Sequence, residues 1–510
     1  MDFKPEKKKL SMSQLSETVT AQQNVTAEIN LPDYCSDIKR ILKCLIIPGV
    51  TSVSVSGENI TANVTADIKL IYVGEKDKID CYETQKDLSF TAKCKAMPSD
   101  AIISPKAKTN YVNCRATSQR RISTEGNITV SFEIYSKAQR EVLTSCEGKG
   151  VQIKQKKICC EKLICQREKV FDMGETLQVP AEKGTVGKIL RTHAYAVLDS
   201  KKAVSDKLLI KGQLYTQVLY CTDGDDSRVS LLEHTMPISQ IIDLQGIDEN
   251  SHCKVSLFVR CLSVQRKSDS SSKGSLLEIG AKVAAFCKCT VKEEVLAVED
   301  CYSTSHEIKT DYALEEFLSP VQSINQQKTI KQTLDFPSAD IANITDIWCS
   351  DTVCSMKGSG NTAKGECSLV ISVLYLDSKG VPQFCEKNVD FVFDSKLREA
   401  CESLRCNMHC EVRSIDSTLT AKDKIELKIE TGISADIYSC LNKRILRGIE
   451  VLSEKEKADM AALTVYFPSK DEKLWDIARR YSTTAQAIRA ENSLEGDTAE
   501  NAEMLLIPAV

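Results

Sequence analysis

The residue types that most often carry enzyme chemistry are scattered in this sequence. The histidines stand singly, and no two have the spacing that would place them on one helix face as metal ligands. They are His193, His234, His252, His306 and His409. The sequence also contains no GxSxG, HExxH or GxxxxGK[ST] motif. We therefore expect a protein that is not an enzyme, with no catalytic residue, no metal site and no cofactor.

The chain carries 23 cysteines, yet no two of them form a CxxC pair, the strongest sequence sign of structural zinc. The closest groupings fit no tetrahedral site; they are Cys159-Cys160, Cys287-x-Cys289 and Cys401-x4-Cys406-x3-Cys410. No apolar signal segment follows the basic N-terminus, so we expect reduced thiols that are buried as small apolar side chains. The alternative is late oxidative cross-linking within an assembled layer.

The segment Asp223-Gly224-Asp225-Asp226 resembles the start of a calcium-binding loop. In an EF-hand, however, position 6 is glycine and position 12 is glutamate, and here these positions are Arg228 and His234. The segment therefore predicts a plain hairpin turn.

Length and charge narrow the class of protein. A chain of 510 residues exceeds the ~250–300 residues that one hydrophobic core supports, so we expect several domains. The net charge of −4 shows no excess of the basic residues that nucleic-acid-binding proteins carry. The most apolar run, residues 41–50, contains Lys43 and Pro48 and is far shorter than the ~20 residues that span a bilayer. We expect a soluble protein with no membrane span and no secretion signal.

One pattern recurs three times along the chain, beginning with an apolar residue and a proline. These pairs are Leu31-Pro32, Val179-Pro180 and Phe336-Pro337. A triplet of apolar residues at i, i+3 and i+4 follows each pair, and this spacing predicts a short helix. The triplets are Ile38, Ile41 and Leu42; Val186, Ile189 and Leu190; and Ile344, Ile347 and Trp348.

Each copy then shows the period-2 alternation of a half-buried strand, as in residues 60–68, and closes on a tyrosine before a turn-rich segment. The tyrosines are Tyr72, Tyr220 and Tyr375. Alternation returns in a later strand of each copy, near residues 128–134, 279–285 and 425–429. Each copy ends on an apolar pair; the pairs are Val142-Leu143, Val295-Leu296 and Ile445-Leu446. We therefore predict a mainly β protein built of tandem β-rich domains and their hairpins.

The repeat spacing sets the expected domain boundaries. They are an N-terminal tail over 1–17, repeat domains over 18–150, 165–303 and 325–452, and a small module over 461–510. We expect a solvated connector around residues 152–168 and a flexible loop over Ser268–Gly274, inside the second domain.

The recurring pattern resembles the SPOCS domains of coat morphogenesis proteins in spore-forming bacteria. The resemblance is carried best by Pro32–Leu42 and by Gly212–Tyr220. It covers most of the chain before the C-terminal module and implies three SPOCS-like repeats.

The C-terminal stretch resembles a LysM module, through Leu474–Tyr481, Ile488–Asn492 and Leu505–Pro508. The residues themselves predict strand, helix, helix, strand, with Leu474, Ile477, Ala478 and Tyr481 on one helix face. Thr483 and Gln486 predict a capping box at the start of the second helix, and Pro468 predicts an early end to the first strand.

LysM modules generally bind N-acetylglucosamine glycans through two loops, one entering the first helix and one following the second. The resemblance places Asp471, Glu472 and Lys473 in the first loop and Asn492, Ser493 and Leu494 in the second. Asp471-Glu472-Lys473 replaces the family's Gly-Asp-Thr triplet, which disfavours glycan binding. We expect Trp475 to pack in the core and Asn492 to cap a helix end.

The resemblance implies a cytoplasmic, mother-cell-side protein at the forespore surface that takes part in spore coat assembly, with a coat ATPase of the SpoIVA type as a partner. We expect a scaffold or adaptor that gains avidity from several weak contacts. The first alternative is an anchor that binds peptidoglycan. The second is a wall hydrolase, which would need a catalytic group that the scan does not find.

Overall fold

The structure is a computed structural model, and it describes residues 4–224, 228–267, 275–401, 403–455, 462–499 and 503–509. The expected loop at Ser268–Gly274 and half of the turn at Asp223–Asp226 lie outside these residues. The prediction of a mainly β protein is confirmed, because strands dominate the described residues and the two α-helices found there are short. None of the helices in the described ranges has the length and apolar character needed to cross a membrane.

Lobe 1, defined as residues 4–147, contains two three-stranded antiparallel sheets in the orders β1-β6-β5 and β2-β3-β4. The strands are β1 (Lys4–Asn30), β2 (Arg40–Ser56), β3 (Asn59–Val73), β4 (Ile79–Lys93), β5 (Ile102–Ser118) and β6 (Arg121–Glu147), and a 3-10 turn, η1, spans Glu75–Asp77. Side chains from both sheets, including Val64 of β3 and Val130 of β6, share one core. The lobe is therefore a β-sandwich.

Lobe 2, residues 151–303, repeats this plan with the sheets β7-β12-β11 and β8-β9-β10. Its elements are β7 (Val151–Gln178), η2 (Ala181–Lys183), β8 (Val186–Val204), β9 (Lys207–Thr222), β10 (Val229–Asp243), β11 (His252–Lys267) and β12 (Leu276–Ser303). Its core also draws on both sheets.

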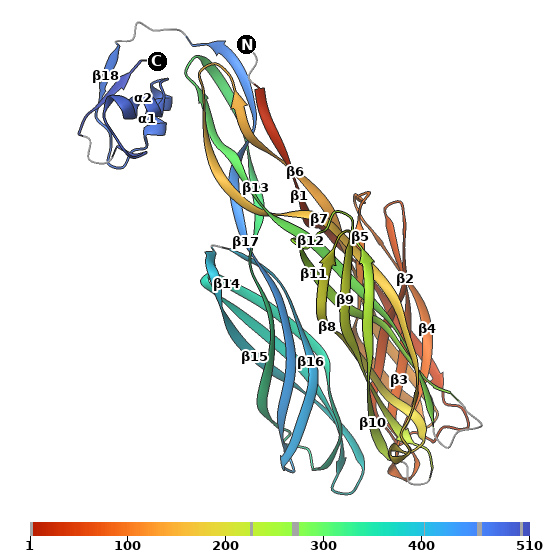
Figure 1. Ribbon diagram of the computed structural model, residues 1–510. Helices are drawn as coiled ribbons and strands as arrows, with labels where there is room; N and C mark the ends of the chain where they lie inside the picture. Colours follow the sequence, from red (N-terminus) through yellow and green to blue (C-terminus); the bar gives the residue numbers. More distant parts are fainter. Residues whose placement is uncertain are drawn as a thin grey trace.

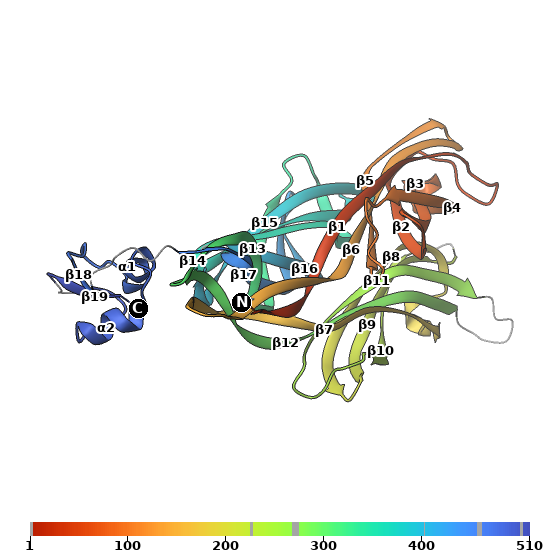
Figure 2. The same ribbon diagram turned by 90° about the horizontal axis from the view of Figure 1, so that it is seen from above.

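Lobe 3, residues 306–454, has the sheets β13-β17-β16 and β14-β15. Its strands are β13 (His306–Asp335), β14 (Ile341–Asp377), β15 (Pro382–Cys401), β16 (Leu404–Ala421) and β17 (Lys424–Glu454). The long β14 turns back on itself at Gly360, which has a φ of +63°, and Ser350 Oγ then donates to the Val370 carbonyl at 3.2 Å. Figure 1 shows lobe 3 beside the other two lobes, which overlap in that view, and Figure 2 shows lobes 1 and 2 as separate groups of strands.

The predicted alternation is confirmed in all three lobes. Ile60, Val64 and Ile68 of β3 are at most 1% exposed, and Ile128 and Phe132 of β6 are fully buried. The corresponding apolar residues of β12 and β17 are also buried. Each predicted hairpin forms: β3 pairs with β4, β9 with β10, and β14 with β15. The tyrosines Tyr72, Tyr220 and Tyr375 lie in the buried core near the strand ends.

The three expected helices are wrong, because the triplet residues lie in or beside β2, β8 and β14. In β2 the strand pairing shifts between Ile41 and Lys43, and in β8 it shifts between Ile189 and Arg191. A bulge of this kind lets two consecutive side chains face the same side of the sheet. The apolar spacing then copies that of a helix turn.

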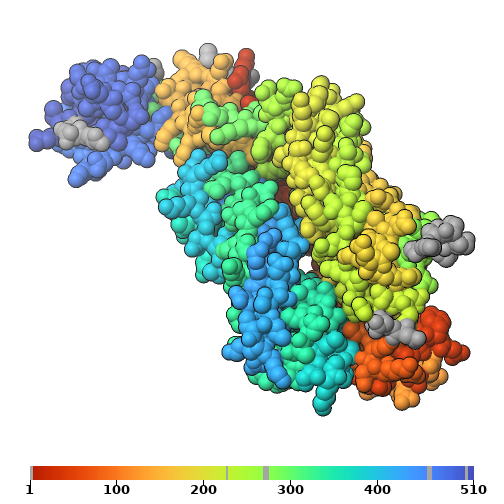
Figure 3. Space-filling view, turned by 60° about the horizontal axis from the view of Figure 1, so that its bottom comes forward, coloured from red at the N-terminus to blue at the C-terminus, as the bar shows by residue number. Residues whose placement is uncertain are grey.

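Residues in or beside the triplets lie at the seams where the lobes meet. Lys188 of lobe 2 forms an ion pair with Asp80 of lobe 1, and Lys43 of lobe 1 forms one with Glu386 of lobe 3 at 2.8 Å. Leu190, fully buried, packs beside Cys81 of the neighbouring lobe. Figure 3 shows lobes 2 and 3 side by side. These residues therefore help to join the lobes to one another.

Three two-stranded extensions, one from each lobe, pack together into a stalk. The stalk is defined as residues 4–15 with 135–147, 151–163 with 290–303, and 306–320 with 437–454. Its buried core takes residues from every lobe: Leu10, Val142, Ile158, Val295, Phe317 and Ile445 in one layer, and Leu143, Val298 and Leu446 in the next. Leu296, the second residue of the apolar pair that ends the second repeat, is 53% exposed and is not part of this core.

The stalk accounts for the stretches expected to lie outside the domains. Residues 4–17, assigned above to a tail, form the first part of β1, and residues 306–324 open β13. The expected solvated connector is wrong, because residues 152–168 belong to β7 and bury Ile158, Cys160 and Leu163.

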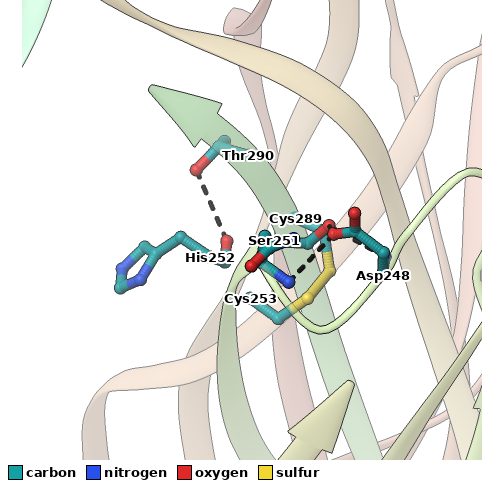
Figure 4. Close-up of a disulfide and its surroundings, with 7 residues drawn as sticks. Asp248, Ser251, His252, Cys253, Cys289 and Thr290 are labelled. Atoms are coloured by element: carbon teal, nitrogen blue, oxygen red, sulfur yellow. Dashed lines mark hydrogen bonds between the residues drawn. A yellow bond between two sulfur atoms is a disulfide. The ribbon is translucent and has the colours of Figure 1, made fainter. Parts of the chain in front are cut away.

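The cysteines differ from expectation at one position. Cys253 of β11 and Cys289 of β12 face each other across the strand pair and form a disulfide (Figure 4). The remaining cysteines are outside disulfides, and all of them are buried or half-buried. Two of these thiols, Cys44 and Cys114, lie on opposite sheets of lobe 1, and the Thr124 hydroxyl is 3.9 Å and 3.5 Å from their sulfur atoms.

Candidate partner-binding module at the end of the stalk

The C-terminal module contains β18 (Leu463–Tyr466), α1 (Leu474–Arg480), α2 (Ala485–Glu491) and β19 (Leu505–Pro508), and β18 pairs antiparallel with β19. Leu474, Ile477 and Ala478 are buried on one face of α1, as predicted. They pack with Ile488 of α2 and with the inward side chains of β19. β18 ends two residues before Pro468, also as predicted.

The module is docked on the tip of the stalk through Asp300 of β12. Trp475 Nε1 of α1 donates a hydrogen bond to Asp300 Oδ2 at 2.9 Å, and Arg479 Nη1 lies 3.1 Å from the same oxygen. Within the stalk, the Tyr312 hydroxyl donates to Asp300 Oδ1 at 2.6 Å. Because charge-assisted hydrogen bonds are roughly twice as strong as neutral ones, the Asp300 carboxylate binds the module firmly to the stalk.

The shared core extends this joint. Tyr302 of β12 is 3% exposed and packs among the core residues of the module, with its ring centroid 4.8 Å from that of Trp475 in an edge-to-face arrangement. Its hydroxyl donates to the carbonyl of Thr483 at 2.9 Å. Lys455 Nζ, which follows β17, donates to the Ser303 carbonyl and to Ser482 Oγ. The module and the stalk tip therefore form one packed unit.

Electrostatics favour the charged form of Asp300. Burial alone would raise the pKa of this carboxyl, but hydrogen bonds from Tyr312 and Trp475 and the charge of Arg479 outweigh it and hold the pKa below its usual value. Asp300 therefore stays ionised at neutral pH and can hold both donors of α1.

The first predicted loop uses its polar groups internally. Asp471 has a φ of +61°, so it keeps the left-handed backbone that a glycine would adopt most easily. The Glu472 carboxylate accepts hydrogen bonds from the Tyr466 hydroxyl at 2.9 Å and from Arg480 at 3.2 Å. These donors, with the Ser469 amide, lower the pKa of Glu472 in spite of the opposing effect of burial. Lys473 is exposed.

The second predicted loop is also engaged within the module. Asn492 follows α2, as expected for a cap; its Nδ2 donates to the carbonyls of Ile488 and Leu506, and its Oδ1 accepts from the Leu506 amide. Ser493 has a φ of +51°, and Leu494 packs against the module core. At the start of α2, the N-cap residue is Thr484. Thr483, which was predicted for this position, is instead fully buried beside the stalk.

The first predicted loop pairs with a segment that lies beyond the second. The backbone of Lys473 pairs with that of Thr498, and the Ala499 amide donates to the Glu472 carbonyl at 2.9 Å. In both predicted loops the polar side chains are engaged, because Glu472 and Asn492 already satisfy their side-chain oxygen atoms with partners inside the module.

The module also carries an exposed apolar surface that was not predicted from the sequence. We call it the outer face: Leu463, Val465, Phe467, Met504, Leu506 and Pro508, on the side of the β18–β19 sheet away from the module core. Phe467 is 71% exposed and Val465 is 51% exposed. The alternation of apolar side chains over residues 463–467, with Tyr466 facing inward, is the signal that could have revealed it.

The structure places neither the histidines nor the cysteines in a metal cluster. Across the described ranges, no group of three or more His, Cys, Asp or Glu side chains is arranged to hold a metal ion.

In the comparison with protein families, residues 185–267 match the family described as "SipL, SPOCS domain", and this segment covers β8, β9, β10 and β11 of lobe 2. The SPOCS resemblance is thereby confirmed for this lobe, and it connects the chain with sporulation. No curated protein and no solved structure matches the chain.

Proposed function

We propose that the protein is a non-enzymatic scaffold of spore coat assembly, in which three SPOCS-like lobes and a LysM-like C-terminal module bind other coat proteins. The SPOCS match supplies the link to sporulation. The observation that carries the mode of action is the outer face of the module, a row of exposed apolar side chains that includes Val465 and Phe467. Contiguous exposed apolar patches mark protein–protein interaction sites.

The partner that we propose for this face is a coat ATPase of the SpoIVA type, on the mother-cell side of the forespore surface. A folded protein can cover an apolar strip with its own apolar side chains and so remove both from water. Weak contacts made by the lobes would add avidity, because the first contact raises the local concentration of the others.

The alternative function is a peptidoglycan anchor. A sugar requires polar groups that are free to bind its hydroxyls. Glu472 and Asn492, the best candidates in the two loops, are instead bound within the module. The geometry therefore favours a protein partner over a glycan.

The test is a paired binding assay with the full-length chain. Purified coat ATPase and purified peptidoglycan are the two ligands, and Phe467→Asp is the test variant. Leu314→Asp is the matched control, because Leu314 is a comparably exposed apolar residue, 74% exposed, on the stalk. We expect the wild-type chain and the control to bind the ATPase and the Phe467→Asp variant to lose binding. Binding to peptidoglycan alone would favour the anchor instead.

A further inference from the structure

Asp300 lies in the stalk, yet its carboxylate is bonded mainly to groups of other elements. It accepts from Trp475 and Arg479 of the module and from Tyr312 of β13. Its neighbour Glu299 points elsewhere and pairs with Lys154 and Lys156 of β7. Two adjacent acidic residues on one strand therefore have different roles, one within a lobe and one between the stalk and the module.

The contact surface between the stalk tip and the module is packed like the interior of a protein. Tyr302 of the stalk is buried against the core residues of α1, and its hydroxyl donates a hydrogen bond to a backbone carbonyl of the module. Trp475 takes part in the same contact, because its indole N–H donates a hydrogen bond to Asp300 and its ring packs against Tyr302. The indole is thus a joint to the stalk and is not available for stacking on a ligand.

We propose that the stalk tip is the docking surface for the chain's own C-terminal module, and that Asp300 is the positioning residue that fixes the orientation in which the module offers its outer face. Asp300 touches no residue of the outer face, so it acts on a partner only through the position of the module. This inference rests on the proposed function for its effect on partner binding, while docking itself is measured without any partner.

Tryptophan fluorescence measures docking directly. The chain has two tryptophans, Trp348 and Trp475, so a Trp348→Phe background leaves Trp475 as the only one. In this background we compare Asp300→Ala and the double variant Asp300→Ala/Tyr302→Ala with Glu299→Ala, the matched control. We expect a red shift of Trp475 emission and greater quenching by acrylamide in the Asp300 variants, and no change in the control.

The size of the effect follows from the lost bonds. A hydrogen bond to a charged group contributes about 1.5–3 kcal/mol, so its removal shifts the docking equilibrium by about ten- to a hundredfold. Asp300→Asn keeps an acceptor for Trp475 but loses the charge that holds Arg479, and it should fall between the wild type and Asp300→Ala. If the emission of the double variant equals that of the control, the proposal is wrong.

Binding of the coat ATPase then separates the two proposals. Weaker binding by Asp300→Ala together with a red-shifted Trp475 supports a positioning role. A red shift in a chain that never binds the ATPase supports docking and contradicts the proposed partner. Undiminished ATPase binding by a clearly undocked variant would overturn the claim that docking orients the outer face.

Discussion

Arg191 of lobe 2 donates from both Nε and Nη2 to the two carboxylate oxygens of Asp346 in lobe 3, at 2.9 Å and 3.3 Å. Each side chain is only 7% exposed, and the ring of Trp348 lies 5.2 Å from the guanidinium carbon. A bidentate pair buried at a seam ties two lobes together in one register, so the relative position of the lobes depends on it.

The first prediction concerns this pair. Asp346→Ala leaves the Arg191 charge buried without its partner, which destabilises a protein by about 3–5 kcal/mol. We expect a lower urea midpoint for the variant. Glu450→Ala is the control, because Glu450 and Lys309 form an ion pair on the exposed side of the stalk and such pairs contribute at most about 1 kcal/mol. An equal decrease of the urea midpoint in both variants would contradict the conclusion that the Arg191–Asp346 pair holds the two lobes together.

The second prediction concerns the stalk. Leu446 is fully buried against Leu143 and Val298, which come from the other two lobes. Leu446→Ala creates a cavity and should cost about 2–5 kcal/mol in the free energy of unfolding. Leu452→Ala, at a residue of the same strand that is 51% exposed, should change it little. A similar small effect at both sites would mean that the three extensions do not share a core.

The third prediction concerns Cys114. A hydrogen bond with Cys44 lowers the pKa of the Cys114 thiol below its usual value against the opposing effect of burial, and the Thr124 hydroxyl adds to the lowering. The thiolate is the reactive form, so alkylation of Cys114 by iodoacetamide should reach its midpoint at a lower pH than that of an ordinary thiol. Cys44→Ala should move that midpoint upward, whereas Cys440→Ala should not. Peptide mass spectrometry gives the rate for each thiol, and an unmoved midpoint in Cys44→Ala would count against the pair.

The fourth prediction concerns pH. Burial raises the pKa of Glu411 to about 7, with Arg413 acting weakly in the opposite direction. The folded state therefore holds this proton more tightly than the unfolded state does, and stability falls as pH rises from about 4.5 to about 7. At 1.36 kcal/mol per pKa unit, the difference between these two values corresponds to a loss of about 3 kcal/mol in the free energy of unfolding.

Glu411→Gln mimics the protonated acid, so it should raise stability at pH 8 and change it little at pH 5. Urea unfolding at the two pH values measures this, with the exposed Glu430→Gln as the control. A wild-type chain that is as stable at pH 8 as at pH 5, and unaffected by Glu411→Gln, would show that Glu411 is ionised throughout.

Whether a strand could be predicted from the sequence depends on how regularly apolar residues recur along its segment. Residues 60–68 alternate strictly, and only a strand puts every second side chain into a core, so β3 could be predicted. The triplet at Ile38, Ile41 and Leu42 could not be interpreted correctly, because the shift in pairing after Ile41 breaks the period of 2. A bulge depends on the partner strand, which local spacing does not reveal.

In the stalk and the module, too, contacts between distant segments could not be predicted from local sequence. Leu10 follows three lysines and Phe317 follows two glutamates, and only the meeting of three distant hairpins buries these two side chains. The loops of the module could be placed from its resemblance, but the engagement of Glu472 and Asn492 depends on partners such as Arg480 and Leu506. The role of Asp300 could not be foreseen, because Trp475 lies 175 residues away in the chain.

The most direct test of the central claim is the affinity of the full-length chain for the coat ATPase in two variants of the module. Val465→Asp places a charge in the middle of the outer face, and Lys473→Ala removes the exposed side chain of the first loop. We expect at least a tenfold loss of affinity for Val465→Asp, about 1.4 kcal/mol, and no loss for Lys473→Ala. Loss with Lys473→Ala and none with Val465→Asp would contradict this claim and would place binding in the loops.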